Sequence, residues 1–223
     1  MNAARLRLVE DALSSEAGAI ALPALPRVIF VVHGALDVEG RRLGAQEAWS
    51  GEGAVSLKAG SEGAMIWRWE LTSGAFPAAP TEPGAASREK LSARLQTLPQ
   101  GALLLRADSV AFPPGGCAYR HRHQGPGIRC LLEGAIRIDT FGRSTSYGPG
   151  GAWYESGPEP VFAQAAEKPT RFVRVMILPL ALQGRSSIEY LDEADKSKPR
   201  TQQYKSYADR PIAFRAPDLS ASA

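Results

Sequence analysis

The chain has 223 residues, of which 44% are hydrophobic and 22% charged, an ordinary composition for a globular protein with a sizeable core. The formal net charge is +3, but Lys and Arg alternate with acidic residues and form no basic run, so we expect no nucleic-acid partner. No segment reaches the roughly 18 to 20 apolar residues of a membrane span. The N-terminus carries acidic residues where a signal peptide needs an apolar stretch. We therefore expect a cytoplasmic protein with no membrane partner.

The first part of the chain combines one short helical pattern with β-rich runs. "RLRLVEDAL", near the N-terminus, is compatible with a short helix, whereas "IALPALPRVIFVVHGALDV", "GAVSLKAG" and "GAMIWRWEL" have the β-branched and apolar composition of strands. Residues 73–86 are rich in Pro, Ala and Gly and are typical of a linker. Ser87 precedes "REKLSARLQ", whose Leu91 and Leu95 lie one turn apart, which predicts a short capped helix.

From residue 103 onward, strand-like runs alternate with Gly and Pro punctuation. The runs lie near 103–111, 118–124, 128–139, 151–155, 161–166 and 171–178. Short strands at this spacing favour an antiparallel sandwich or barrel over alternating β and α units. After "VMILPL" the composition becomes polar, and we expect residues 183–223 to form an extended tail.

An internal similarity links the two parts of the chain. "VVHGALDV" (31–38) is similar to "LLEGAIRI" (131–138), and each is followed by a Gly-rich turn, an aromatic strand and a later β-rich run. Similar units in the same order predict two related β-folds, which should superpose about Gly34 and Gly134. Chance similarity between strands of like composition is the alternative.

Two of the three histidines lie one residue apart in "YRHRHQGPGIRCLLEGAIRI". Alternation along a strand places Cys117, Tyr119, His121 and His123 on one face. Two inward imidazoles at this spacing can reach one ion, although a histidine pair on a strand is more often structural. The two cysteines, Cys117 and Cys130, are expected to be free thiols that pack in the core, with Cys117 a weaker candidate for a soft ligand.

The segment "GGCAYRHRHQGPGIRCLLEG" resembles the first motif of the cupin superfamily, G-x5-H-x-H-x3–4-E-x6-G, with Gly115, His121, His123 and Gly134 in register. "GPGGAWYESGPEPV" resembles the second motif. The resemblance implies an all-β, cupin-type jelly roll and a bicupin whose N-terminal half is degenerate. The expected domains are a cupin-like half with its linker at 1–86, a cupin domain with the histidine pair at 87–182, and a polar tail at 183–223.

Two ligand positions of the cupin motifs are not filled by ligands here. Gly127 stands where the motif has glutamate, and Val161 stands close to the second-motif histidine. Glu155 is the candidate replacement, because a carboxylate would complete a set of two histidines and one carboxylate around a divalent ion such as Fe, Mn, Ni or Zn. Its direction depends on strand parity, and Gln124 is a weaker candidate.

Arg129 is expected to face the barrel interior, because it lies two residues after Gly127 on the same strand. A buried guanidinium needs a carboxylate partner or an anionic ligand. Two roles stay open: an internal salt bridge to Glu155, or an anchor for an anionic substrate.

The functional prediction is a metal-dependent cupin enzyme of the oxygenase or isomerase type, acting on a small organic substrate such as a carboxylate. His121, His123 and Glu155 would bind the metal, Arg129 would hold the anion, and Tyr119 would donate a proton or a hydrogen bond. The alternative is a metal-free cupin that senses or binds a small molecule without catalysis. Because cupins pair through strand exchange and extended arms, the polar tail favours a homodimer.

Overall fold

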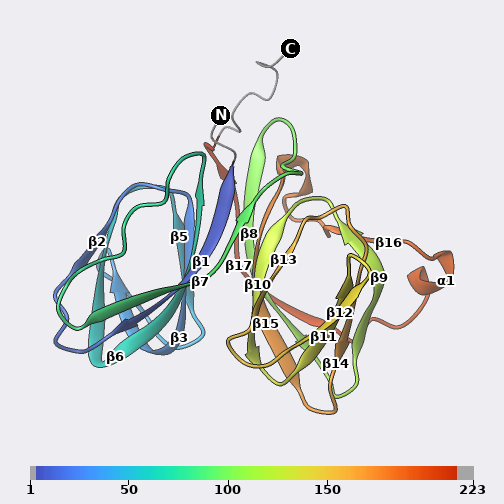
Figure 1. Cartoon of the computed structure of the whole chain (residues 1–223), viewed down its shortest axis with the longest axis horizontal. Helices are drawn as coiled ribbons and strands as arrows, with labels where there is room; N and C mark the ends of the chain where they lie inside the picture. The colour runs from blue at the N-terminus through green and yellow to red at the C-terminus, as the bar shows by residue number, and fades with distance from the viewer. Residues whose placement is uncertain (1–3, 215–223) are drawn as a thin grey trace. The chain divides into compact units, whose positions relative to one another are not determined.

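The computed structural model describes residues 4–214, and the chain divides into two compact units (Figure 1). Of the described residues, 4–94 and Phe214 belong to the first unit and 95–213 to the second. Strands dominate both, in agreement with the all-β prediction. No helix among the described residues is long and apolar enough to cross a membrane.

The first unit is one antiparallel sheet of seven strands that wraps around its own core. Its longest strand has 18 residues and pairs with three others along its length. Register shifts in β3 at Val31/His33 and at Gly34/Leu36 accompany this long pairing. The strands are β1 (Arg5–Leu13), β2 (Ile20–Leu22), β3 (Arg27–Val38), β4 (Arg41–Leu43), β5 (Ala48–Gly51), β6 (Val55–Thr72) and β7 (Ala85–Arg94).

The second unit has two five-stranded antiparallel sheets with an apolar core between them. The first sheet contains β8 (Leu103–Phe112), β10 (Gly127–Glu133), β13 (Ala152–Glu155), β15 (Thr170–Pro179) and β17 (Gln203–Ile212). The second contains β9 (Cys117–His123), β11 (Ile136–Thr140), β12 (Arg143–Tyr147), β14 (Val161–Ala165) and β16 (Ile188–Tyr190). The 3-10 helix η1 (Leu180–Leu182) and the short helix α1 (Glu193–Lys196) lie in the connections.

The same strand order recurs in the two units. In the first unit β5 pairs with β3, which gives the path β5-β3-β6-β1-β7, and the second unit has β13-β10-β15-β8-β17. Gly34 and Gly134 have φ values of 77° and 82°. A Cβ atom would lie 2.2 Å from the Gly63 carbonyl oxygen at Gly34 and 2.4 Å from that of Pro169 at Gly134, so only glycine fits either position. These findings agree with the internal similarity in the sequence.

The two helices expected in the first part of the chain are wrong. "RLRLVEDAL" is β1, hydrogen-bonded to β6 on one side and to β7 on the other. The expected capped helix after Ser87 belongs to β7, where Leu91 pairs with Leu8 and the Ser87 hydroxyl donates to Asp11 at 2.6 Å instead of capping a helix. Hydrogen bonding of β1 to a strand on each side outweighed a weak local helix preference.

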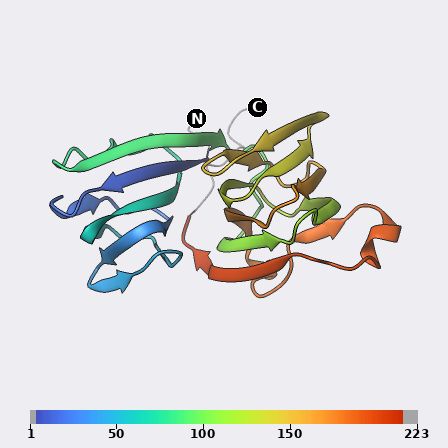
Figure 2. The same cartoon turned by 90° about the horizontal axis from the view of Figure 1, so that it is seen from below.

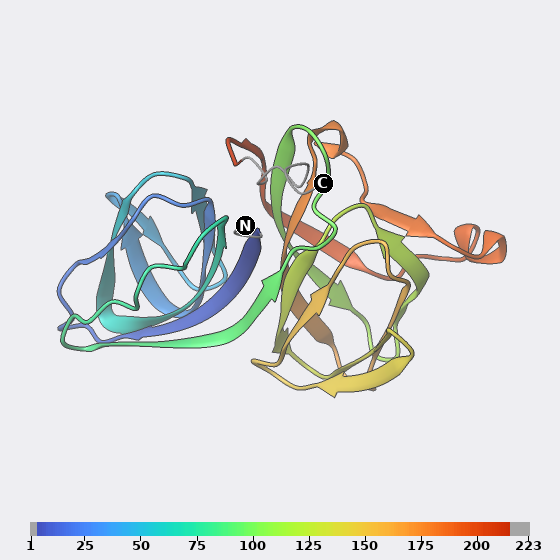
Figure 3. The same cartoon turned by 45° about the horizontal axis from the view of Figure 1, so that its top comes forward.

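The segment expected as a polar tail contributes strands to the second unit. β16 pairs with β9, and β17 pairs with β8 along its whole length, as the red and green strands of Figure 2 show. Figure 3 shows β16 and α1 at the edge of this barrel. Because these strands pair within their own chain, the described part of the segment is not a free arm for exchange between subunits.

Candidate functional site

A cavity of about 20 Å³ lies between the two sheets of the second unit. This volume holds about one water molecule. The apolar part of its wall includes Val110, Phe112 and Val161. Its polar lining comes from five strands and consists of His121, His123, Arg129, Glu155, Arg174 and Tyr204.

Both histidines face the interior, as predicted from strand parity. His121 is 4% exposed and His123 3% exposed, and their ring centroids lie 4.9 Å apart. His121 Nδ1 lies 2.7 Å from the Tyr119 carbonyl oxygen, and His123 Nδ1 lies 3.3 Å from the Ser187 hydroxyl. Burial lowers the pKa of His121, and it lowers that of His123 well below its ordinary value, helped by the positive charges of Arg129 and Arg174. Both imidazoles are therefore neutral at pH 7.

Tyr119 and Cys117 do not share the face of the histidines, which corrects the parity expected for the whole strand. The register between β9 and β14 shifts, so that Val161 pairs with His121 but Ala163 pairs with Ala118. This bulge places Ala118 in the cavity wall, whereas the Tyr119 ring lies outside it, 4.6 Å from Lys198 Nζ. The structure does not bring Tyr119 to the site.

Glu155 points into the barrel and is 5% exposed. Its Oε2 lies 2.7 Å from Arg129 Nη2 and 3.6 Å from His123 Nε2, and its Oε1 accepts a hydrogen bond from the Trp153 indole at 2.8 Å. The structure therefore contains the salt bridge that was one of the two roles open for Arg129. Gln124, the weaker ligand candidate, is exposed.

Arg129 is fully buried on β10. Its Nη1 donates to the Gly127 carbonyl oxygen at 2.8 Å, while its Nε has no hydrogen-bond partner. Burial lowers the pKa of Arg129 to about 10, opposed by the attraction of Glu155. The guanidinium is therefore a fixed positive charge beside the histidines at neutral pH.

The donor set does not match a metal site in this arrangement. Among the described residues, no group of three or more His, Cys, Asp or Glu side chains is placed to hold one ion. The only carboxylate in the cavity wall is already paired with Arg129, and Val161 contributes an apolar side chain opposite His121. Two neutral imidazoles and a neutralised carboxylate leave a divalent cation without a compensating charge.

A second ion pair borders the site and was missed from the sequence. Arg174 on β15 binds Asp108 on β8 through two bonds, at 2.6 and 3.1 Å, and both residues are buried. Burial alone would lower the pKa of Arg174, but the pairing with Asp108 outweighs it and raises the pKa. The signal for this pair was available: an arginine inside the apolar run "RFVRVMIL" requires an acidic partner.

A larger cavity of about 420 Å³, here called the vestibule, adjoins the small one. Arg174, Ile188 and Tyr204 line both cavities and so form the boundary between them. Most of the remaining wall comes from the segment after Leu182, which the sequence had not linked to a site. The charged residues of the vestibule are Arg106, Asp108, Arg174, Arg185, Arg200 and Asp209.

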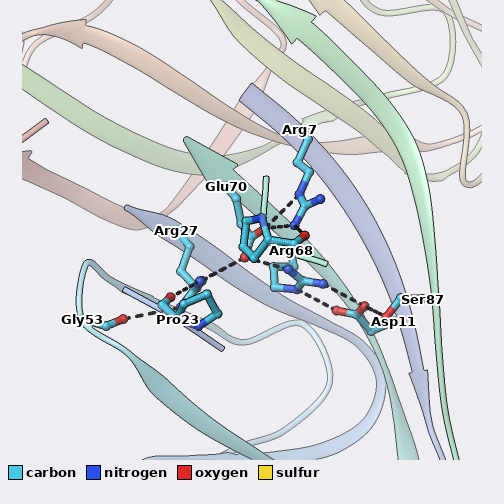
Figure 4. A network of polar contacts seen from close by, with 9 residues as sticks. Arg7, Asp11, Pro23, Arg27, Gly53, Arg68, Glu70 and Ser87 are labelled. Carbon is cyan, nitrogen blue, oxygen red and sulfur yellow. Dashed lines mark hydrogen bonds and ion pairs between the residues drawn. The ribbon is translucent and has the colours of Figure 1, made fainter. Parts of the chain in front are cut away.

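The matching strands of the first unit carry a closed network of buried charges (Figure 4). Glu70 on β6 binds Arg7, Arg27 and Arg68 at 2.7, 3.1 and 2.6 Å, and Arg68 also binds Asp11 at 2.8 Å. Backbone carbonyl oxygens of Pro23 and Pro77 accept further hydrogen bonds from Arg27 and Arg7. Burial would raise the pKa of Glu70, but the neighbouring arginines lower it. No histidine takes part in this network.

Comparisons with known proteins show similarity in structure but not in sequence. No protein-family model matches the chain, and no curated protein matches it significantly. Among solved structures, a variant of oxalate decarboxylase from Bacillus subtilis has a TM-score of 0.57 at 13% identity, covering 86% of this chain and 73% of that one. AerE from Microcystis aeruginosa has a TM-score of 0.55 at 14% identity, covering 78% and 87% of the two chains.

A salicylate 1,2-dioxygenase from Pseudaminobacter salicylatoxidans is also similar, with a TM-score of 0.53 at 13% identity and coverage of 77% and 70%. All three are cupin-fold proteins with two barrels. The match extends over most of this chain, so it includes both units, and their shared strand order agrees with it. The protein therefore has the cupin fold in its two-barrel form and is, in architecture, a bicupin.

Proposed function

We propose that the second unit binds a small organic acid in the vestibule, without a metal ion. The observation that carries the proposal is an excess of positive charge in the vestibule wall. Four arginines face two aspartates there, and Arg106 and Arg174 are paired with Asp209 and Asp108. Arg185 and Arg200 are exposed and have no acidic partner in the described part of the chain. Two guanidinium groups at one opening favour a ligand with one or two carboxylates.

The size and chemistry of the vestibule suit a small molecule. Its volume of about 420 Å³ lies within the range of ligand pockets. Tyr190 and Tyr204 add aromatic surface, and the Arg200 guanidinium lies 5.1 Å from the centre of the Tyr190 ring. The hydroxyls of Ser186, Ser187 and Ser206 add hydrogen-bonding groups. A carboxylate on a short or aromatic carbon skeleton matches this combination.

The names of similar proteins support an acidic ligand. Oxalate decarboxylase and salicylate 1,2-dioxygenase act on carboxylates by name. In this chain the inner cavity of about 20 Å³ is too small for such a molecule, so the ligand body occupies the vestibule and approaches the histidines at the boundary formed by Arg174, Ile188 and Tyr204.

Metal-dependent catalysis is the competing function, and the convergence of His121, His123 and Glu155 on one cavity favours it. The ion pair between Glu155 and Arg129 favours the metal-free alternative, because it occupies the only carboxylate of the cavity wall. Elemental analysis of the purified full-length protein separates the two: stoichiometric metal supports catalysis, and its absence supports metal-free binding.

Calorimetric titration with a panel of mono-, di- and aromatic carboxylates tests the proposed ligand class. The primary amide of each acid serves as the ligand control. The double variant Arg185→Gln/Arg200→Gln should weaken binding about a hundredfold or more, since each of the two lost charged contacts is worth roughly 1.5 to 3 kcal/mol. Arg143→Gln, an exposed arginine outside the vestibule, is the matched protein control and should leave affinity unchanged. Equal affinity of the double variant and the wild type would refute the proposal.

A further inference from the structure

The space next to Gly127 is taken by the guanidinium of Arg129. A Cβ atom added at Gly127 would lie 2.9 Å from Arg129 Nη1, 2.8 Å from Met176 Cγ and 2.4 Å from the Val175 carbonyl oxygen. The first of these contacts comes from a side chain that folds back along its own strand. The position where the cupin motif has a glutamate therefore has room only for hydrogen, and a cation occupies the adjacent volume.

The arginine is held in that volume by contacts on both sides. Nη1 donates to the Gly127 carbonyl oxygen at 2.8 Å, Nη2 lies 2.7 Å from Glu155 Oε2, and Nη2 also lies 3.7 Å from Met176 Sδ. The side chain is fully buried, so none of its charge is exposed to solvent. Its charge is therefore a permanent component of the cavity wall.

The carboxylate that faces Arg129 is also the one nearest to a histidine. Glu155 Oε2 has no hydrogen-bond partner apart from the ion pair and lies 3.6 Å from His123 Nε2. With Arg129 removed, this oxygen and the two imidazoles would stay beside the cavity, together with Tyr204 and with Arg174, whose charge is paired with Asp108. The carboxylate and the two imidazoles are the ligand types of a site with two histidines and one carboxylate.

We infer that Arg129 is a built-in cation that takes the place of a metal ion in the second barrel. It neutralises Glu155, repels a divalent cation from His121 and His123, and supplies positive charge where an ion would otherwise stand. The barrel therefore retains three side chains of metal-ligand type, and Arg129 is the cation paired directly with their carboxylate, whereas Arg174 is paired with Asp108. This inference does not depend on which acid the vestibule binds.

The test compares metal binding by the wild type and by variants that remove the charge of Arg129. The full-length protein is freed of metal with a chelator and titrated with Co²⁺, monitored by its visible absorption and by elemental analysis. Arg129→Met fills a similar volume without charge and should bind one equivalent of Co²⁺ at least about tenfold more tightly than the wild type. Co²⁺ should also raise the melting temperature of this variant but not that of the wild type.

Three controls separate this effect from general disruption. Arg129→Lys keeps the charge and should gain no Co²⁺ affinity, whereas Arg129→Gln, which keeps polarity without charge, should gain it. Arg129→Met/Glu155→Gln should lose the gain, because the carboxylate is required. The inference is overturned if the wild type itself binds one Co²⁺ and Glu155→Gln abolishes that binding, or if folded Arg129→Met and Arg129→Gln gain none. Neither result bears on acid binding by Arg185 and Arg200, which the calorimetric titration tests separately, but metal bound to the wild type would also contradict the metal-free part of the proposed function.

Discussion

The two barrels of this chain use the same strands to bury charge in opposite ways. In each, an arginine of the central strand binds an aspartate of the neighbouring strand: Arg68 with Asp11 in the first unit, Arg174 with Asp108 in the second. The first unit then surrounds Glu70 with three arginines and caps them with carbonyl oxygens. The second leaves Arg129 Nε without a hydrogen-bond partner beside a cavity, where Glu155 Oε2 has only its ion pair with Arg129.

This difference separates a structural use of buried charge from a functional one. A buried polar group that is satisfied stabilises a unique arrangement, whereas an unsatisfied one costs stability and is retained where a ligand or water can reach it. By this criterion the charge network around Glu70 is structural, and the charged groups beside the cavity of the second unit are open to a ligand or water. Four experiments test this difference between the two units.

Replacing Glu70 should have the largest effect. Glu70→Gln removes the negative charge that three buried arginines share, so we expect the first unit to lose about 3 to 5 kcal/mol of unfolding free energy. Urea denaturation combined with hydrogen exchange of peptides from each unit measures this loss locally. Glu89→Gln, at an exposed position on β7, should cost less than about 0.5 kcal/mol. Similar costs for the two variants would show that the network is not structural.

Replacing Glu155 should cost the second unit less. Glu155→Ala strands one buried guanidinium instead of three and removes the acceptor of the Trp153 indole, so we expect a loss of about 3 kcal/mol. The same urea and hydrogen-exchange measurement applies, together with the metal content of the variant. Unchanged stability accompanied by lost metal would instead identify Glu155 as a ligand and contradict the metal-free interpretation.

Mild acid should affect the two units differently. The pKa values of His121 and His123 are lowered in the folded chain, so the unfolded chain binds protons first and stability falls as pH drops below about 6.5. Each histidine can lower the free energy of unfolding by at most about 1.4 kcal/mol for each unit of pH. In the first unit the pKa of Glu70 is lowered, and that of Glu10 is lowered to about 2. These two carboxylates therefore stabilise the folded first unit until the pH falls below about 4.5, where the unfolded chain begins to bind protons.

Denaturation curves at pH 7.5 and 5.5 measure this contrast. The second unit alone should weaken between these values, and His123→Asn should reduce the dependence on pH. A parallel loss in both units would contradict the assignment of the effect to the histidine pair.

The smallest effect is expected at Tyr119. Its ring lies outside the cavity and contacts Lys198, so Tyr119→Phe should change stability by less than about 0.5 kcal/mol and leave acid binding unchanged. Calorimetry with the acid that binds most tightly checks the second point. A tenfold loss of affinity would show that the hydroxyl reaches the ligand and would restore the role expected from the sequence.

Short-range periodicity predicted the β-rich class and the face of the main site residues, whereas the cupin-type fold was predicted from the resemblance to the cupin motifs. His121, His123 and Arg129 lie on strands whose alternation is regular at those positions, and all three face the cavity. Alternation failed at Tyr119, because β9 has one extra residue between its pairs with Val161 and Ala163, and no local sequence pattern predicts this bulge.

Features that depend on distant partners were not predictable in the same way. β1 and β7 became strands because each supplied an edge that the other could pair with, and Leu8 and Leu91 are far apart in the sequence. The vestibule depends on residues such as Arg185 and Arg200, in a segment whose polar composition matched a tail. Composition describes solvent exposure, but it does not say which strand edge a polar segment will cover.

The pairing of β17 with β8 has a consequence for how the second barrel is made. Ile212 pairs with Leu103 and Tyr204 with Val110, so β17 closes a loop of about a hundred residues. During synthesis this edge of β8 stays unpaired until Ile212 has left the ribosome. An exposed strand edge of this kind can pair with other chains and aggregate. Release of the nascent chain before β17 is made would therefore produce aggregation-prone protein without a complete vestibule.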